Sequence, residues 1–171
     1  MMDWARSSAP RLPAERCAQG GGFSLFLRRW ARNPLRMGSV VPSSPALCRR
    51  IARLARRGPG ESAVDLGAGT GVVSRALLRS GLPPERLVAV EVVPEMAEHL
   101  RRTLPGVGVL CGDAFELPRL LPAALHGRIG TVICGIPLVL LPLERQRRFV
   151  SAVDAVAPGH GFLLRSYWDP G

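Results

Sequence analysis

The 171-residue sequence predicts an α/β fold in which a parallel sheet carries helices on both faces. From residue 62 onward, short apolar runs rich in Val and Ile alternate with segments whose apolar residues recur at helical spacing. A glycine-rich turn at residues 67–71 joins the first such strand to the first such helix. The length suits one domain with a core of its own, so no second domain is required.

The composition combines an ordinary core with an unusual charge. Hydrophobic residues make up 47% of the chain and aromatic residues 5%, so aliphatic side chains must fill the interior. The net charge is +10, and all 23 basic residues are arginines. Such a charge attracts nucleic acid or an anionic membrane surface, and composition alone does not choose between them.

The cysteines indicate no metal chemistry. Cys17, Cys48, Cys111 and Cys134 lie far apart and form no CxxC pair, so the sequence predicts no metal site. The N-terminus shows no secretory signal, and we therefore expect reduced thiols and a cytoplasmic protein. Cys111 and Cys134 lie in or beside expected strands and are interpreted as small core residues.

The first part of the chain is basic and divides in two. Residues 1–22 lack an apolar period and are expected to be a disordered basic tail. Residues 23–58 are expected to form two amphipathic helices rich in arginine, the first ending before Pro34. Such a helix suits a membrane interface or packs on its own domain, and both interpretations stay open. The apolar side of the first helix comprises Phe23, Phe26, Leu27 and Trp30.

The second of these helices has clear boundary signals. Ser44 followed by Pro45 is a favourable pair for the N-cap and first turn, and Gly58 is a favourable stop. The residues expected to share its apolar face are Leu47, Ile51, Leu54 and Ala55. Residues 62–171 then form the expected α/β core.

The stretch from Ala63 to Gly71 reads as a buried strand, a glycine turn and the start of a helix. Glycines at alternate positions let the backbone approach a ligand, and the free N–H groups of the helix start point at that ligand. Asp65 adds a negative charge at the end of the strand. The turn residues that we expect to contact a ligand are Gly67, Ala68, Gly69 and Gly71.

Two further strands each end beside an acidic residue. Leu87–Glu91 is the second expected strand, and Glu91 falls twenty residues after Gly71, the spacing of an ordinary βαβ unit. A carboxylate at that position can accept hydrogen bonds from both hydroxyls of a ribose. A helix from Pro94 and a third strand, 107–111, follow, and Asp113 comes directly after that strand.

The order of these features resembles the class I S-adenosylmethionine-dependent methyltransferases. Residues 65–71, Asp-Leu-Gly-Ala-Gly-Thr-Gly, are similar to the first motif of that class, whose acid engages the methionine amino group. The resemblance implies that S-adenosylmethionine is the cofactor and that Glu91 accepts hydrogen bonds from its ribose hydroxyls. It also implies that Asp113 takes the adenine amino group and that the N–H of Ala114 meets a ring nitrogen.

The resemblance implies a Rossmann-like sheet with helices on both faces. A fourth strand at 128–135, a helix at 143–157 and a fifth strand at 162–168 complete the expected elements. A full class I sheet has two more strands, and the sequence ends at Gly171, so strands six and seven are expected to be missing.

Two stretches bear on the methyl acceptor. The segment 26–34 with Gly-Ser-Val-Val-Pro-Ser-Ser at 38–44 resembles the soluble bacterial phospholipid N-methyltransferases, which modify phosphatidylethanolamine. That resemblance implies that Ser43 and Ser44 lie near the methionine end of the cofactor, although Ser44 is equally expected as a helix cap.

The second stretch follows the fourth strand. Adenine N6-methyltransferases place a polar residue and an aromatic residue there, and this chain has Gly135 and Leu138 instead. The expected substrate-contacting residues are Gly135, Ile136, Pro137 and Leu138, whose apolar character resembles that of the lipid enzymes. Tyr167, at the end of the fifth strand, is the candidate for orienting the acceptor amine or accepting its proton.

Three functional hypotheses follow. The first is a peripheral enzyme at the inner face of the membrane that methylates phosphatidylethanolamine, with its arginine-rich N-terminal helices on anionic lipid. The second is a relative of the ribosomal RNA adenine N6-dimethyltransferases, with nucleic acid as the less favoured partner. The third is an inactive relative that binds lipid or nucleic acid. The sequence does not indicate an oligomeric state.

Overall fold

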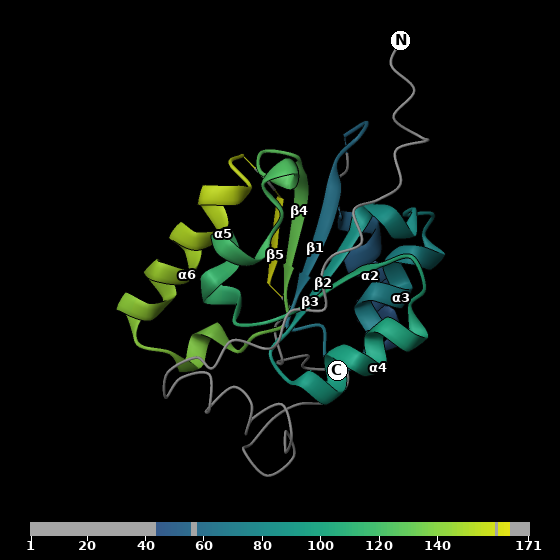
Figure 1. Ribbon diagram of the computed structural model, residues 1–171, viewed down its shortest axis with the longest axis horizontal. Helices are drawn as coiled ribbons and strands as arrows, with labels where there is room; N and C mark the ends of the chain where they lie inside the picture. The colour runs from purple at the N-terminus through teal and green to yellow at the C-terminus, as the bar shows by residue number, and fades with distance from the viewer. Residues whose placement is uncertain (1–43, 56–57, 160, 165–171) are drawn as a thin grey trace.

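The protein is built on a five-stranded, fully parallel sheet with strand order β3-β2-β1-β4-β5 (Figure 1). The computed structural model describes residues 44–55, 58–159 and 161–164. The strands are β1 (Ser62–Leu66), β2 (Leu87–Glu91), β3 (Gly108–Cys111), β4 (Ile129–Cys134) and β5 (Gly161–Leu164). The α/β fold with a Rossmann-like parallel sheet is therefore confirmed.

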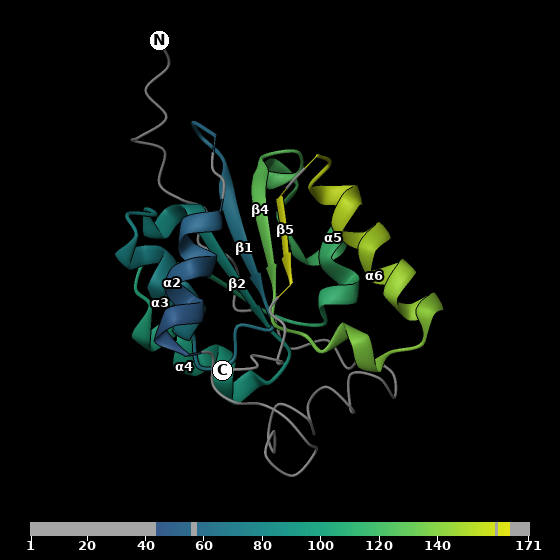
Figure 2. The same cartoon turned by 180° about the vertical axis from the view of Figure 1, so that it is seen from behind.

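Helices cover both faces of this sheet. On one face lie α2 (Pro45–Leu54), α3 (Val72–Arg79) and α4 (Pro94–Thr103). The other face carries α5 (Leu117–Leu120) and α6 (Leu143–Val156), and Figures 1 and 2 show the two groups on opposite sides. The described residues also include the short 3₁₀ helices η2 (Pro84–Arg86), η3 (Ala114–Glu116), η4 (Ala123–Leu125) and η5 (Leu138–Leu140).

The central strand divides the core between the two faces. Side chains alternate across a strand, so Val64 and Leu66 enter the cluster under α5 and α6, while Ala63 enters the cluster under α2 and α3. All five residues of β1 are buried, as expected of a parallel strand covered on both faces.

The chain order places a switch point beside β1. The chain proceeds outward from β1 to β2 and β3 and then returns to place β4 on the other side of β1. In open parallel sheets, ligands bind at the carboxyl ends of the strands next to such a reversal. The carboxyl edge of the sheet is formed here by the last residues of β1 to β4, which are Leu66, Glu91, Cys111 and Cys134.

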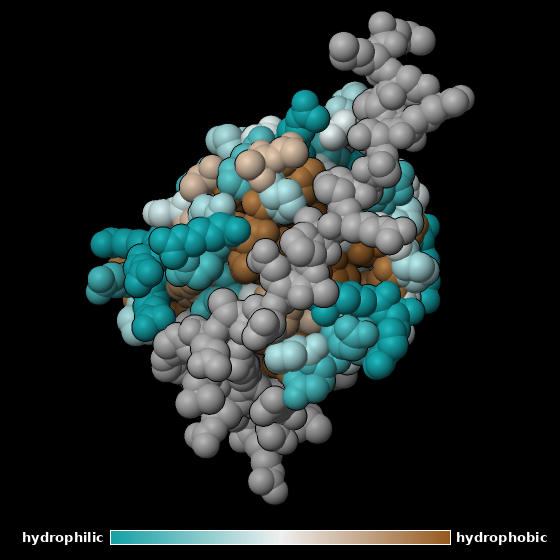
Figure 3. All heavy atoms as spheres, in the orientation of Figure 1, coloured by the Kyte–Doolittle hydropathy of each residue, from teal (hydrophilic) through white to brown (hydrophobic). Residues whose placement is uncertain are grey.

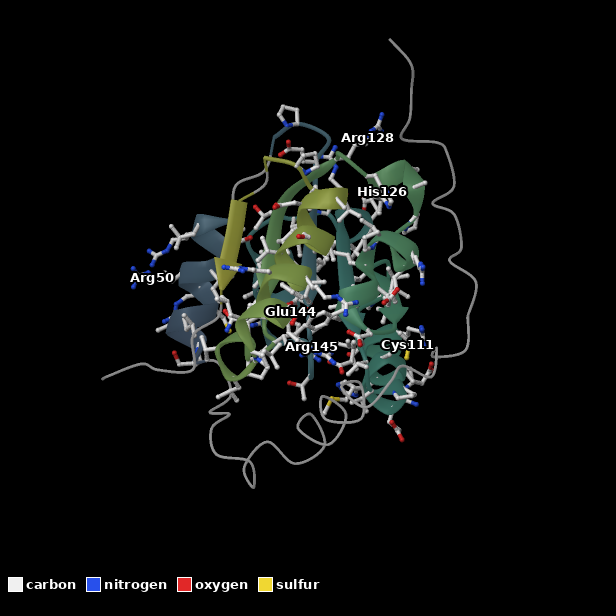
Figure 4. All side chains as sticks on the ribbon, turned by 90° about the vertical axis from the view of Figure 1, so that its left-hand side faces the viewer. Arg50, Cys111, His126, Arg128, Glu144 and Arg145 are labelled. Atoms are coloured by element: carbon white, nitrogen blue, oxygen red, sulfur yellow. The ribbon has the colours of Figure 1, made fainter. Side chains whose placement is uncertain are left out.

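Figure 4 shows the two ends of the sheet in side view. Cys111, at the end of β3, and Arg145, near the start of α6, lie toward one end of the molecule. His126 and Arg128, just before β4, lie at the other end. The loops after the strands therefore gather at the end marked by Cys111 and Arg145.

The helix α2 differs from expectation in two details. Leu54 is 53% exposed, because the buried stripe follows Cys48, Ile51, Ala52 and Ala55 and leaves Leu54 off that face. The helix also ends at Leu54 rather than at Gly58, whose N–H donates to the Glu61 carboxylate instead. Its predicted start is confirmed, since Ser44 Oγ accepts from Leu47 N–H at 3.2 Å.

The cysteines also differ in part from expectation. Cys48 and Cys134 are buried free thiols, and Cys134 is the small core residue that the sequence predicted. Cys111 is partly buried and forms a disulfide, so its interpretation as a reduced core thiol was wrong. None of the described helices has the length and apolar character that crossing a bilayer requires.

Several expected features lie outside the described residues. They are the basic tail, the first amphipathic helix with Trp30, the segment containing Ser43, and the end of the fifth strand with Tyr167 and Trp168.

Replacing Phe149 tests the packing of α6. Phe149 is fully buried, and its ring meets that of Phe115 edge to face at a centroid distance of 5.4 Å. We expect Phe149→Ala to lower the free energy of unfolding by about 3 to 5 kcal/mol, measured by urea titration. Val150→Ala is the matched control, since Val150 is 46% exposed and its loss should cost less than about 1 kcal/mol. Equal losses in the two variants would contradict the placement of α6.

Candidate functional site

The glycine turn after β1 adopts a conformation that favours glycine. Gly67, Gly69 and Gly71 have φ values of 71°, 57° and 80°, in the left-handed region. A Cβ at Gly71 would lie 2.7 Å from Leu100 Cδ2, and one at Gly67 would lie 3.0 Å from Ile136 Cγ1. Backbone conformation therefore favours glycine at all three positions, and close packing also requires it at Gly67 and Gly71.

The middle of the turn is open on its outer side. A Cβ at Gly69 would meet no atom within 4 Å, so space remains above the turn for a ligand. Gly71 is the N-cap of α3, whose first N–H groups have no partner within the helix. The turn thus offers an accessible backbone surface beside a helix N-terminus.

Asp65 is held below this turn by α3. Its side chain is 1% exposed, and its Oδ2 accepts a hydrogen bond from Ser74 Oγ at 2.6 Å. Ser74 lies in the first turn of α3 and is itself fully buried. The contact joins the end of β1 to the helix that follows the glycine turn, and so fixes the carboxylate at the carboxyl edge.

Glu91 links the end of β2 to the same turn. Its Oε2 accepts from Gly69 N–H at 2.8 Å, and its Oε1 accepts from Val93 N–H at 3.0 Å. Burial raises the pKa of Glu91, and the backbone N–H groups of Val93, Gly69 and Val92 oppose that effect. Each carboxylate oxygen retains a lone pair, so Glu91 can still accept from ligand hydroxyls.

Asp113 stands in the loop after β3. It caps η3, its Oδ1 accepting from Phe115 N–H at 3.0 Å, while Oδ2 has no partner among the described residues. Burial raises the pKa of Asp113, and the charges of Arg145 and Arg148 on α6 act in the opposite direction. The adjoining Ala114 is buried. One carboxylate oxygen is therefore available to a donor such as an amino group.

The structure brings the predicted ligand-binding groups to one edge. Asp65 and the glycine turn, Glu91, and Asp113 with Ala114 follow the carboxyl ends of three adjacent strands, β1, β2 and β3. Neighbouring strands lie about 4.8 Å apart, so these ends span roughly 10 Å. Such a row suits an extended ligand that carries an amine at one end, a diol in the middle and a heterocyclic amine at the other end.

The stretch after β4 lies directly against the turn. Gly135 N–H donates to Leu66 O at 2.7 Å, and Ile136 packs on Gly67. The side chains of Ile136 and Leu138 are 5% and 6% exposed and belong to the core under α6. The four predicted substrate residues, Gly135, Ile136, Pro137 and Leu138, are thus beside the site but buried.

The exposed apolar side chains come just after that stretch. Val139 is 73% exposed, Leu140 57% and Leu143 60%, and we call these three residues the apolar rim. Their exposure was not predicted from the sequence, although Pro142 at the end of the apolar run marks a surface loop. The role of Ser74 was not predicted either, because its contact with Asp65 depends on the rotation of α3, which no local motif indicates.

Comparisons with known proteins agree with this geometry. The family described as "Methyltransferase domain" matches residues 63–161, more than half of the chain. The ornithine lipid N-methyltransferase of Singulisphaera acidiphila is 29% identical over 142 residues, which cover 81% of this chain and 74% of that protein. The ribosomal RNA small subunit methyltransferase A of Moorella thermoacetica is 34% identical over 102 residues, 53% of this chain.

A solved structure supports the fold. The sugar N-methyltransferase KedS8 from a Streptoalloteichus species superposes with a TM-score of 0.55 at 22% identity, covering 94% of this chain. The chain spans 59% of KedS8 and 34% of the ribosomal RNA enzyme. The chain therefore aligns with only part of each of these two larger proteins.

Replacing Glu91 tests the predicted ribose contact. We expect Glu91→Gln to weaken S-adenosylmethionine binding at pH 7.5 by about 10- to 100-fold, because a charged acceptor becomes neutral. In the unchanged protein, affinity should fall as the pH decreases toward the raised pKa of Glu91, since protonation removes the charge. The variant should show a shallower pH dependence in calorimetric titrations.

Glu98→Gln is the control, because Glu98 is an exposed residue of α4 that pairs with Arg101. Cofactor affinity should then match that of the unchanged protein. Binding by Glu91→Gln that is as tight as in this control would contradict the ribose contact.

Proposed function

The chain belongs to the class I S-adenosylmethionine-dependent methyltransferases, and we propose that it methylates the amino headgroup of a membrane lipid, with phosphatidylethanolamine as acceptor. The relative named as an ornithine lipid N-methyltransferase supports an amino lipid. The bound cofactor supplies an activated methyl group, and the residues placed to hold it are the glycine turn, Asp65, Glu91, Asp113 and Ala114. We further propose that the protein works as a peripheral enzyme at the inner face of the membrane.

The apolar rim is the observation that carries this proposal. Val139, Leu140 and Leu143 project from the β4–α6 connection, next to the residues that pack on the glycine turn. A cluster of exposed aliphatic side chains beside a binding site marks a contact with membrane or protein. Arg147 and Arg148 are exposed one turn further along α6, so cations flank the apolar rim, as at a membrane interface.

Figure 3 shows the surface on this side of the molecule. Hydrophilic side chains gather over α6, at the left of the view, next to apolar surface toward the centre. This arrangement supports a face that meets both headgroups and acyl chains.

Methyl transfer to an amine requires positioning and loss of a proton. An ethanolamine ammonium has a pKa of about 10, like a lysine, so it must be deprotonated before it attacks a methyl group. Holding the amine in line with the methyl group supplies most of the acceleration. We propose that Tyr167 orients the amine or takes its proton. We also propose that the backbone of residues 135–138 lines the site beside the amine.

A ribosomal RNA adenine methyltransferase is the second candidate. The +10 charge and the relative of that name favour it. Against it, Gly135 has no polar side chain to hold an adenine amino group. Leu138 is 6% exposed and has no aromatic ring to stack on a flipped base. An inactive binding protein is the third candidate, and it would show no turnover with any acceptor.

Transfer of labelled methyl groups tests the proposed function. The protein is incubated with methyl-labelled S-adenosylmethionine and vesicles of phosphatidylethanolamine and phosphatidylglycerol. We expect label in the lipid fraction, and at least tenfold less label with Glu91→Gln at a subsaturating cofactor concentration. Vesicles of phosphatidylcholine and phosphatidylglycerol are the control, because their amine is already fully methylated. Label in added ribosomal RNA but not in lipid would support the second candidate instead.

A variant of the apolar rim tests its contact with lipid. We expect Val139→Asn with Leu140→Asn to weaken vesicle binding by about tenfold or more, because two aliphatic side chains no longer leave water. Sedimentation with vesicles measures this change. Val150→Asn is the control, since Val150 is 46% exposed on α6 but lies outside the apolar rim. Equal binding by the double variant and this control would exclude the rim as a lipid contact.

A further inference from the structure

A groove of about 650 Å³ lies between α2 and α3, and its lining shares no residue with the predicted cofactor contacts. These two helices lie side by side on the same face of the sheet, as Figures 1 and 2 both show. Pro45 and Val72, the first residues of the two helices, line one end of the groove, and Ser80, just after α3, lines the other. The groove therefore runs along the helices from the level of the glycine turn.

Four arginines line this groove. Arg49 and Arg53 stand one turn apart on α2, and Arg75 and Arg79 stand one turn apart on α3. Residues four apart share a helix face, so each helix contributes a pair of guanidinium groups to the same hollow. We call Arg49, Arg53, Arg75 and Arg79 the groove arginines.

The groove arginines have no acidic partner among the described residues. None of the described residues that line the groove is acidic, and Arg75 donates to Thr70 O at 2.6 Å and to Thr103 Oγ1 at 3.4 Å, both uncharged. Four positive charges that face one hollow repel each other, and a bound anion relieves this repulsion. Guanidinium groups suit phosphate in particular, since they donate paired hydrogen bonds to two of its oxygens.

The remainder of the lining is mostly small and apolar. It includes Cys48, Ala52, Val72 and Ala76, between the two pairs of arginines. Proteins that bind single-stranded nucleic acid use aromatic side chains that stack with bases, and the lining contains no aromatic residue within the part of the chain that the structure describes. An anionic phospholipid matches better, because its phosphate meets the arginines while its glycerol and first methylenes meet the apolar part.

We propose that the groove between α2 and α3 binds the phosphate-bearing headgroup of an anionic phospholipid, and so holds the carboxyl edge of the sheet against a membrane. The proposal rests on the proposed function for its choice of a membrane as the source of the phosphate. It adds a lipid site separate from the acceptor site, which makes anionic lipid a docking partner in addition to the amino lipid that is methylated.

A pair of charge-removing substitutions tests the groove. Arg53→Gln with Arg79→Gln removes one guanidinium from each helix, and both side chains are exposed in the structure. With full-length protein and vesicles of 30% phosphatidylglycerol in phosphatidylcholine, without cofactor, we expect affinity to fall on the order of 20-fold. This value assumes that each arginine near an anionic surface raises the affinity about fivefold.

Arg102→Gln with Arg128→Gln is the matched control. Both are exposed arginines outside the groove, at the end of α4 and before β4, so the change in net charge is identical. We expect less than a threefold loss for this pair. A similar loss in the two double variants, or no loss in the groove variant, would overturn the proposal. Reduced binding of RNA by the groove variant with vesicle binding intact would also overturn it, in favour of nucleic acid.

Vesicle binding, measured together with methyl transfer from labelled S-adenosylmethionine, separates this proposal from the proposed function. Protein that binds anionic vesicles through the groove but transfers no methyl group to any lipid overturns the proposed function and leaves the groove proposal standing. Protein that methylates lipid while the groove variant binds vesicles as tightly as the control overturns the groove proposal alone.

Discussion

The candidate site depends on one buried carboxylate that joins two strand ends. Glu91 ends β2, accepts from Gly69 N–H in the turn after β1, and accepts from Val93 N–H where the chain leaves for α4. The contact between Asp65 and Ser74 secures the other side of the same turn. Burial makes an ionised carboxylate costly, and hydrogen bonds from backbone N–H groups reduce that cost for Glu91. The turn is therefore held in shape before any ligand binds.

Much of this arrangement could be predicted from the sequence, because its signals are local. The Asp-Leu-Gly-Ala-Gly-Thr-Gly run at 65–71 requires a strand, a positive-φ turn and a helix in succession, and the structure has all three. The spacing from Gly71 to Glu91 is fixed by one helix and two strands, so the second acid could be placed as well. Asp113 could be placed because it directly follows a strand.

The remaining features depend on packing between distant segments. Leu138 was expected to contact the substrate, but its side chain is buried under α6 at the start of η5, and Val139 and Leu140 are the exposed residues. Leu54 was expected in the core, and the orientation of α2 on the sheet leaves it exposed. The groove arginines come from helices that are separated by β1, so no single window of sequence brings them together. The apolar rim and the groove flank the glycine turn on two sides, and they support the proposed docking of the carboxyl edge on lipid.

We expect the cofactor to lie along the carboxyl edge of the sheet, across β1, β2 and β3. Amide NMR spectra of the protein titrated with S-adenosylhomocysteine test this placement. The signals of Gly67, Gly69, Val93 and Ala114 should shift together and saturate with one dissociation constant. Shifts confined to α2 and α3, or no saturable shift at these four amides, would contradict it.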